Sequence, residues 1–448
     1  MNFYLSKLLV VVFLVLSFFS SARGSSGRAP KADTTFTVYQ IDTLIELARK
    51  NNQSLKVSAS GVDIAHQGVD VARSRRYPTV STSLTAGYLG DVSLIDKDFS
   101  NATNVPMPHF ANSFSMQASQ LIFKGNAINS AIATASLQEQ IAALNLEEDV
   151  LDVKLLVAGN YLDLYKLYNQ KTVYEKNLEL ARLRFEQIQK LYKAGMVTRN
   201  DLIRSELQIA NLKLARQVVV NNAGIVNKQL TTATGLPSTV VILPDSAILN
   251  AKPVTPPQYD YESVALKNYP ALQSARINTE VAEKNLQIAK SDLSPSLSLY
   301  AGSSLDRPLT SSSPALDMYS HGWQAGLSLA FNIDALYKAP QNIKLNKLRV
   351  VQSRELETLQ EQNRSVVLNA AYIRHNEAIS RWTTLRQNML LANENYRIVE
   401  KKYLNQLALF IDMLDASNEK LNAELEYTNA EINILYTYYQ LQKEAGIL

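Results

Sequence analysis

The residue types that carry most enzyme chemistry are sparse in this chain. It has no cysteine, which excludes disulfides, thiolate metal sites and a lipid-modified N-terminal cysteine. Four histidines lie far apart in sequence, so each is more simply an ordinary polar or loop residue than a metal ligand: His66, His109, His321 and His375. A glycine-rich phosphate loop, a nucleophile elbow and closely spaced metal ligands are also missing. We therefore predict no catalytic residue, no metal site and no cofactor, and we do not expect an enzyme.

One pair of carboxylates has a suggestive spacing. Asp412 and Asp415 are three positions apart, which puts both on one face of a helix. Acids in the first turn of a helix are also favourable by themselves, because they lie at the positive end of the helix dipole. The pair gains a further meaning only if several copies of this helix meet around an axis.

The balance of charges limits the partners. The 448 residues include 45 basic and 41 acidic side chains, a net charge of +4. So small an excess attracts neither nucleic acid nor any strongly charged partner. A chain of this length is expected to form two or three domains.

One long helix dominates the elements that must position these residues. Residues 126–194 contain no proline and one internal glycine, Gly159. Two apolar stripes with alternating four- and three-residue spacing run through this segment, one containing Leu155 and the other Val157. Two stripes predict coiled-coil packing on two flanks. The helix would be about 100 Å long, and Gly159 would permit either a close helix contact or a bend.

The N-terminus predicts export. Lys7 precedes an apolar run that ends at Phe19, and small residues suited to cleavage follow. Because this run is short for a membrane span, we interpret residues 1–22 as a cleaved signal peptide rather than an anchor, and residues 23–35 as a flexible N-terminal segment. No later stretch of 18 or more apolar residues appears. We expect the mature chain to leave the cytoplasm without a transmembrane helix.

Short alternating segments interrupt the helical pattern. A helix predicted from about Val38 to Arg75 stops before Pro78, since the residue before a proline resists helix. Residues 79–88 then alternate apolar with small or polar side chains, and residues 114–122 repeat this pattern after a loop. Each run is about ten residues long, which is enough for a tilted strand to cross a bilayer.

The long helix is predicted to turn back on itself. Gly195 interrupts it, Thr198 is a suitable N-cap, and a return helix lasts to about Thr234. Residues 236–257 contain five prolines around a short β-like segment, and we interpret them as a proline-rich linker.

The same plan then starts again. Pro78 corresponds to Pro295 at an offset of 217, and Tyr192 corresponds to Tyr403 at an offset of 211. A second pair of strands is predicted at residues 296–302 and 322–331. Each copy contains a helix, two strands and a long helical hairpin, so we divide the mature chain into two structural repeats, 36–235 and 258–448.

The number of strands predicts an assembly. Four membrane strands cannot close a barrel, since about eight is the smallest closure by one chain. An open edge in hydrocarbon would leave N–H and C=O groups unpaired. Three protomers would supply about twelve strands for one β-barrel. The predicted fold is mainly α with a small β part: duplicated long antiparallel α-hairpins form an α-helical barrel beneath the β-barrel.

This organisation resembles the TolC family of outer-membrane efflux proteins. The resemblance covers about residues 36–446 and rests on the duplication and on three segments: Gln120-Leu121-Ile122-Phe123-Lys124-Gly125, Ala194-Gly195-Met196-Val197-Thr198-Arg199-Asn200-Asp201-Leu202 and Ile411-Asp412-Met413-Leu414-Asp415-Ala416. It implies a homotrimeric channel-tunnel that contacts outer-membrane lipid, extends into the periplasm and conducts substrate passively. The implied partners are a periplasmic adaptor (membrane fusion protein) and an inner-membrane pump, in drug efflux or type I secretion.

The resemblance also assigns roles to residues. At matching positions, Asp412 and Asp415 of three protomers would form a ring of carboxylates that favours cations at the periplasmic aperture; the alternative is that they are ordinary first-turn acids. Tyr403 matches a family tyrosine that bonds an aspartate of the first hairpin, here Asp201, as a latch. Ala408 stands where the family prototype has an arginine, so the lock is weaker or built differently, and Tyr403 is equally explained as a packed residue of the stripe.

The hairpin tips are the implied docking sites for the adaptor, namely Gly195, Met196, Val197, Thr198 and Leu407. The alternative function is that of a soluble periplasmic coiled-coil adaptor or scaffold, which would also be exported and rich in long hairpins. Such a protein would not need four alternating strands of about ten residues at symmetric positions. The strands therefore favour the channel.

Overall fold

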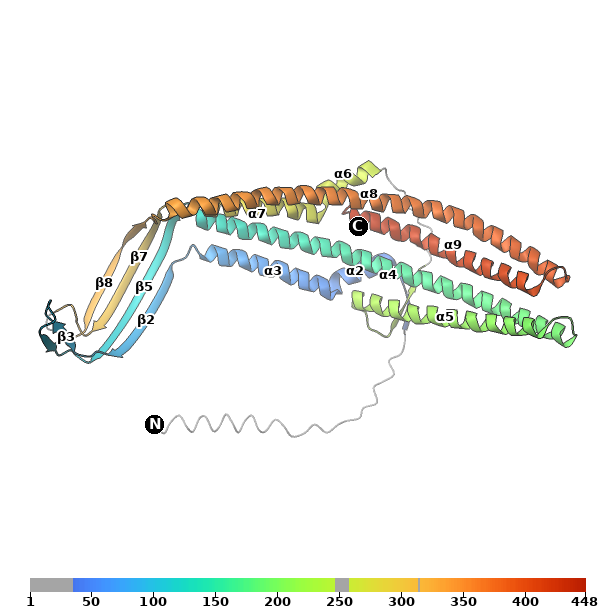
Figure 1. Ribbon diagram of the computed structural model, residues 1–448, viewed down its shortest axis with the longest axis horizontal. Coiled ribbons are helices and arrows are strands. Elements are labelled where there is room, and N and C mark those ends of the chain that lie inside the picture. The colour runs from blue at the N-terminus through green and yellow to red at the C-terminus, as the bar shows by residue number, and fades with distance from the viewer. Residues whose placement is uncertain (1–34, 246–257, 313–314) are drawn as a thin grey trace, which may run out of the picture.

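Two long helical hairpins form the framework of the computed structural model, which describes residues 35–245, 258–312 and 315–448. α4 (Ala127–Lys193) and α5 (Arg199–Thr234) make the first hairpin, and α8 (Ala335–Leu404) and α9 (Phe410–Glu444) make the second. The hairpins lie side by side, with α4 next to α9 and both tips at the same end (Figure 1). The predicted signal peptide lies outside the described residues, as do most of the N-terminal segment and of the linker.

Two shorter helices continue this layer away from the tips. α3 (Gln53–Ser74) packs beside α4, and α7 (Pro270–Ser291) packs between α4 and α8. The helices therefore follow one another as α3-α4-α7-α8 in one half and as α5-α4-α9-α8 in the half that ends at the tips (Figure 1). Within the described part of the chain, no helix combines the length and the apolar character that a membrane crossing requires.

α4 has packing partners on both flanks, as its two stripes predict. Leu162 shares a buried cluster with Leu435 of α9. Leu178 shares another with Leu212 of α5. Apolar contacts therefore cover both flanks of this 67-residue helix, each from a different neighbour.

The strands form one antiparallel sheet at the end of the helical layer opposite the tips (Figure 1). β2 (Thr79–Tyr88), β5 (Phe110–Lys124), β7 (Ser296–Arg307) and β8 (Ser320–Ala330) follow the order β2-β5-β7-β8. All four predicted strands are present. β5 and β7 are longer than predicted, because they pair with each other over nearly their full length. β2 and β8 are the edges of the sheet, and among the described residues no strand pairs with their outer sides.

The predicted loop between the first two strands also contains structure. β3 (Val92–Ile95) and β4 (Ala102–Val105) pair as a small antiparallel hairpin at the far end of the sheet. The alternation there is only four residues long on each side, too short to stand out among the surrounding polar and proline residues.

The first predicted helix is wrong at its start. β1 (Thr35–Tyr39) pairs in parallel with β6 (Val240–Pro244), so Val38 is extended rather than helical. Two helices, α2 (Ile41–Asn51) and α3, replace the single helix predicted. The break lies at Asn52, whose side-chain oxygen accepts hydrogen bonds from the backbone N–H groups of Ser54 (2.9 Å) and Leu55 (3.4 Å) and so caps a new helix.

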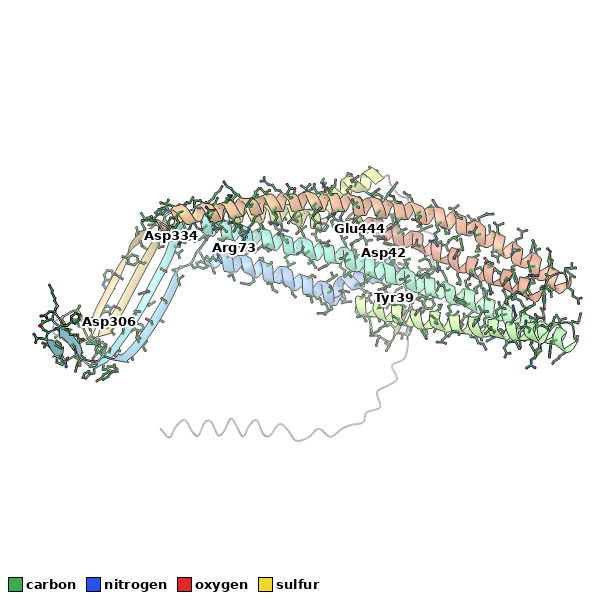
Figure 2. All side chains as sticks on the ribbon, in the orientation of Figure 1. Tyr39, Asp42, Arg73, Asp306, Asp334 and Glu444 are labelled. Carbon is green, nitrogen blue, oxygen red and sulfur yellow. The ribbon has the colours of Figure 1, made fainter. Side chains whose placement is uncertain are left out.

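A second layer covers one face of the helices midway between the sheet and the tips. It consists of β1, β6, α2 and α6 (Gln258–Asn268), and we call it the equatorial layer. One buried core joins Leu44 of α2 with Val157 of α4 and Ile242 of β6. A second core packs Tyr261 of α6 against Ala445, beside the end of α9. Tyr39 and Asp42 mark this layer in Figure 2.

Candidate functional site

The tip of the first hairpin is built as the sequence predicts. Gly195 has a φ of +75°, and the N–H of Met196 donates a hydrogen bond of 2.9 Å to a carbonyl of the last turn of α4. The N–H of Asp201 donates to Oγ1 of Thr198 (3.2 Å), and the N–H of Thr198 donates to Oδ2 of Asp201 (3.0 Å), which is a capping box. The Met196 side chain is exposed, whereas Val197 packs inward.

The second tip repeats this geometry without a glycine. Gln406 lies 211 positions after Gly195 and has a φ of +61°, and the N–H of Leu407 donates to the carbonyl of Lys402 over 2.8 Å. A side chain in this region carries a backbone strain that glycine avoids. The Leu407 side chain is 77% exposed. The backbone hydrogen bonds of the two turns therefore match at the offset found in the sequence, whereas Leu409 stands in place of the capping Thr198.

Asp412 and Asp415 lie in the first turns of α9, and both are exposed. Oδ2 of Asp412 accepts a hydrogen bond of 2.9 Å from the N–H of Leu409, so Asp412 does cap its helix. Among the described residues, the carboxylate of Asp415 accepts no hydrogen bond. It precedes Asn429 by two heptads and Tyr436 by three, so these three side chains share one face of the coiled-coil helix.

Tyr403 and Asp201 are close together, but no hydrogen bond joins them in this conformation. The Tyr403 ring packs 5.9 Å from the ring of Phe410, between centroids. Its hydroxyl is buried and, among the described residues, has no hydrogen-bond partner. Burial raises the pKa of this hydroxyl, and the negative charge of Asp201 raises it further. The Asp201 carboxylate is instead occupied by Thr198.

A buried arginine joins the two hairpins near their tips. Arg184 of α4 is only 7% exposed. It donates through Nη1 to Oγ of Ser417 on α9 (3.3 Å) and through Nη2 to the hydroxyl of Tyr396 on α8 (2.5 Å). The Tyr396 hydroxyl in turn donates to Glu400. Burial is the main reason that the pKa of Tyr396 rises to about 12. We call these four residues the Arg184 bridge.

Two more polar pairs cross the same boundary between α4 and α9. Nε2 of Gln170 donates to Oδ1 of Asn429 (2.8 Å), and Nδ2 of Asn177 donates to Oε2 of Glu424 (3.1 Å). Gln170, Asn177 and Arg184 are seven residues apart, and polar groups at packed heptad positions fix the register of a coiled coil at some cost in stability. The apolar stripes of α4 do not single out these three residues, and their heptad spacing is the sequence signal that identifies them.

Known outer-membrane proteins resemble this chain along nearly its whole length. The sequence model described as "Outer membrane efflux protein" matches residues 44–236 and 262–446. Outer membrane protein TolC of Escherichia coli (strain K12) is 24% identical over 461 aligned positions, which cover 99% of this chain and 87% of that protein. Outer membrane efflux protein BepC of Brucella suis biovar 1 is 23% identical, over 89% of this chain and 83% of that protein.

A crystal structure of CusC has the same fold. It aligns with a TM-score of 0.77 at 16% sequence identity and covers 92% of this chain and 93% of that one. The predicted fold, mainly helical with long antiparallel helix pairs and a four-stranded antiparallel sheet, is therefore confirmed, whereas a soluble adaptor or scaffold fits neither the sheet nor the relatives. On these matches, the chain belongs to the outer membrane efflux protein family, whose members are channels of the outer membrane and not enzymes.

Proposed function

We propose that three copies of this chain close into one conduit that crosses the outer membrane and extends through the periplasm. Three copies of the four-stranded sheet supply about twelve strands. Two copies would supply about eight, and the interior of an eight-stranded barrel is just filled by side chains. Three is therefore the smallest number of copies that leaves a passage.

The free edges of the sheet carry this proposal. All neighbours in the order β2-β5-β7-β8 are antiparallel, so β2 and β8 run in opposite directions. β8 of one protomer can therefore pair with β2 of the next and continue the same pattern around a ring. In hydrocarbon, each unpaired N–H or C=O group costs several kcal/mol, so both edges need a partner.

The two faces of the sheet support a wall between lipid and water. One cross-strand row is entirely apolar and contains Val80, Ala118, Ala301 and Ala325. The adjacent row, on the opposite face, has small or polar side chains and contains Ser81, Gln117, Gly302 and Gln324. The first face suits lipid and the second a water-filled interior.

Efflux partners follow from the family, and we propose that they are a periplasmic adaptor and an inner-membrane pump. The sequence contains no phosphate-binding loop, so the chain has no evident means of using nucleotide energy and conducts passively. The adaptor would dock at the hairpin tips, where Met196 and Leu407 expose apolar side chains next to Gly195, Val197 and Thr198. The cargo would be a drug in an efflux system or a protein in type I secretion.

The aperture of the conduit would lie at these tips. Asp412 and Asp415 of three protomers would form a ring of six carboxylates that favours cations. Two observations support the ring. Both aspartates are exposed, and Asp415 shares a heptad face with Tyr436, which lines a hollow on the side of the helices that would face the interior of the conduit. The latch between Tyr403 and Asp201 would form in a second conformation, in which Asp201 leaves Thr198 and accepts a hydrogen bond from the unpartnered hydroxyl.

Conductance across planar bilayers tests this function. Purified wild-type protein should form channels that prefer cations, and the double variant Asp412→Asn/Asp415→Asn should lose most of that preference. A matched control removes two carboxylates from the equatorial layer, Glu46→Gln and Asp260→Asn, and should leave selectivity unchanged. An unchanged preference in the aspartate variant would refute the ring, and a protein that never conducts would refute the conduit.

A further inference from the structure

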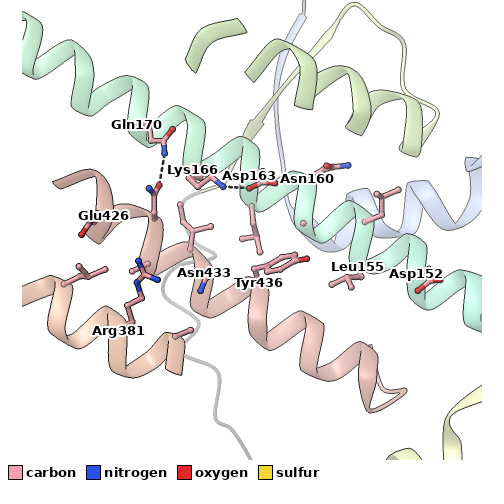
Figure 3. Close-up of a pocket in the computed structure, with 18 residues that line it drawn as sticks. Asp152, Leu155, Asn160, Asp163, Lys166, Gln170, Arg381, Glu426, Asn433 and Tyr436 are labelled. Carbon is pink, nitrogen blue, oxygen red and sulfur yellow. Dashed lines mark hydrogen bonds and ion pairs between the residues drawn. The ribbon is translucent and has the colours of Figure 1, made fainter. Parts of the chain in front are cut away.

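A hollow of about 940 Å³ lies where α4, α8 and α9 meet (Figure 3). Gly159 of α4 faces the ring of Tyr436 on α9, and a Cβ at this glycine would lie only 3.2 Å from Cε2 of the tyrosine. Of the two roles open to Gly159, the structure therefore supports the close helix contact. Leu155 and Leu156 add apolar surface to the lining of the hollow.

The hollow faces away from the equatorial layer. The hydroxyl of Tyr161 donates to the carbonyl of Tyr39 in that layer (2.8 Å), whereas Asp163, about half a turn further along α4, lines the hollow. On the second hairpin, Ala445 packs against the equatorial layer, and Tyr436 lines the hollow. The two residues are nine positions, or about two and a half turns, apart, so they lie on opposite sides of the helix. If the proposed conduit exists, the equatorial layer is its outer cover and the hollow opens inward.

Two charged side chains that line the hollow have no partner in the part of the chain that the structure describes. Asp163 is paired with Lys166 (2.5 Å), and Asp152 is paired with Lys443 (2.9 Å). Among the described residues, the side chains of Arg381 on α8 and Glu426 on α9 have neither an ion pair nor a hydrogen bond. Figure 3 shows both of them toward one end of the hollow and Leu155 toward the other.

We propose that this hollow binds amphipathic zwitterions, molecules that carry a carboxylate and an ammonium group beside an apolar body. Arg381 pairs with the carboxylate and Glu426 with the ammonium, while Tyr436 and the leucines contact the apolar body. Because both charged side chains reach water, each pair is weak, and a dissociation constant of about 1 mM or higher is expected. Weak binding suits a conduit, which must release what it holds.

Transient block of single channels in planar bilayers tests the site. The probe is ampicillin at pH 6, a zwitterion with a phenyl ring, and its chemical control is benzylpenicillin, which lacks the amine. Ampicillin should interrupt the wild-type current. Arg381→Gln and Glu426→Gln should each shorten the interruptions about two- to fivefold, the effect of one exposed charge pair. Interruptions caused by benzylpenicillin should become shorter in Arg381→Gln and stay unchanged in Glu426→Gln.

The protein control is Arg397→Gln. This arginine is sixteen positions, or about four and a half turns, after Arg381 on α8, so it lies on the opposite face of the coiled-coil helix. The Arg397→Gln variant should leave the ampicillin block unchanged. Two results would overturn the site but not the conduit. In the first, the channels conduct and ampicillin never blocks them. In the second, the block survives Arg381→Gln and Glu426→Gln and disappears in Asp412→Asn/Asp415→Asn. A protein without conductance would overturn both.

Discussion

Tyr396→Phe removes one hydroxyl from the boundary between the hairpins and leaves the aromatic ring in place. That hydroxyl accepts from Nη2 of Arg184 over 2.5 Å and donates to Glu400. Because Arg184 is 7% exposed, water replaces the lost acceptor poorly. A hydrogen bond to a charged group contributes about 1.5–3 kcal/mol. Since about 1.4 kcal/mol is a tenfold change, the equilibrium between joined and parted hairpins should shift about 10- to 100-fold in each protomer.

The assay is single-channel recording in planar bilayers, with the open fraction as the measured quantity. Tyr396→Phe should raise it, because parting of the hairpins widens the periplasmic end. Tyr192→Phe is the matched control: this tyrosine also lies near the tips, but its side chain is 40% exposed, so its loss should change nothing. A folded Tyr396→Phe protein with the open fraction of the wild type would refute the idea that the Arg184 bridge holds the hairpins together.

Three further predictions concern buried hydroxyls and glycines. The pKa of Tyr396 is raised from 10.0 to about 12 in the folded state, so its contribution to stability is complete below pH 10 and is lost as the pH rises from 10 to 12; the urea midpoint of the wild type should fall in this window more than that of Tyr396→Phe. Tyr403→Phe removes a buried hydroxyl that has no hydrogen-bond partner among the described residues, so thermal stability should stay equal or rise slightly. An increase in conductance would reveal that the latch forms in another state. Gly235→Ala should lower the melting temperature, because the residue has a φ of +72° and a Cβ would lie 2.6 Å from Cβ of Asn51. The control is Gly224→Ala, where the new Cβ meets open space and the helix should gain up to about 1 kcal/mol of stability. Equal effects of the two substitutions would contradict this account.

Local pattern was enough for the long elements. The stripes of α4, the alternation of β2 and the cap at Thr198 each lie within one segment, and the structure contains all three. The duplicated tips could also be predicted, because Gly195 and Gln406 make the same turn at the offset read from the sequence.

Contacts between distant segments were not predictable in this way. Val38 fits a helical pattern, yet it is extended because it pairs with Leu243, more than 200 residues away. The Arg184 bridge needs three helices from both repeats to meet at one place. A single stripe shows that a helix is packed, but it does not show which polar side chain will face the partner.

Closure of the sheet between protomers is the central claim, and disulfide trapping tests it most directly. The chain has no cysteine of its own, so Thr82→Cys in β2 can be combined with one cysteine at each of positions 322–328 in β8. Within one protomer, β5 and β7 separate these edges by about 14 Å, too far for a disulfide. We predict that at least one pairing yields covalent trimers that a reductant converts to single chains. Single chains at every position, together with a detergent-solubilised particle of one-chain mass, would contradict the account.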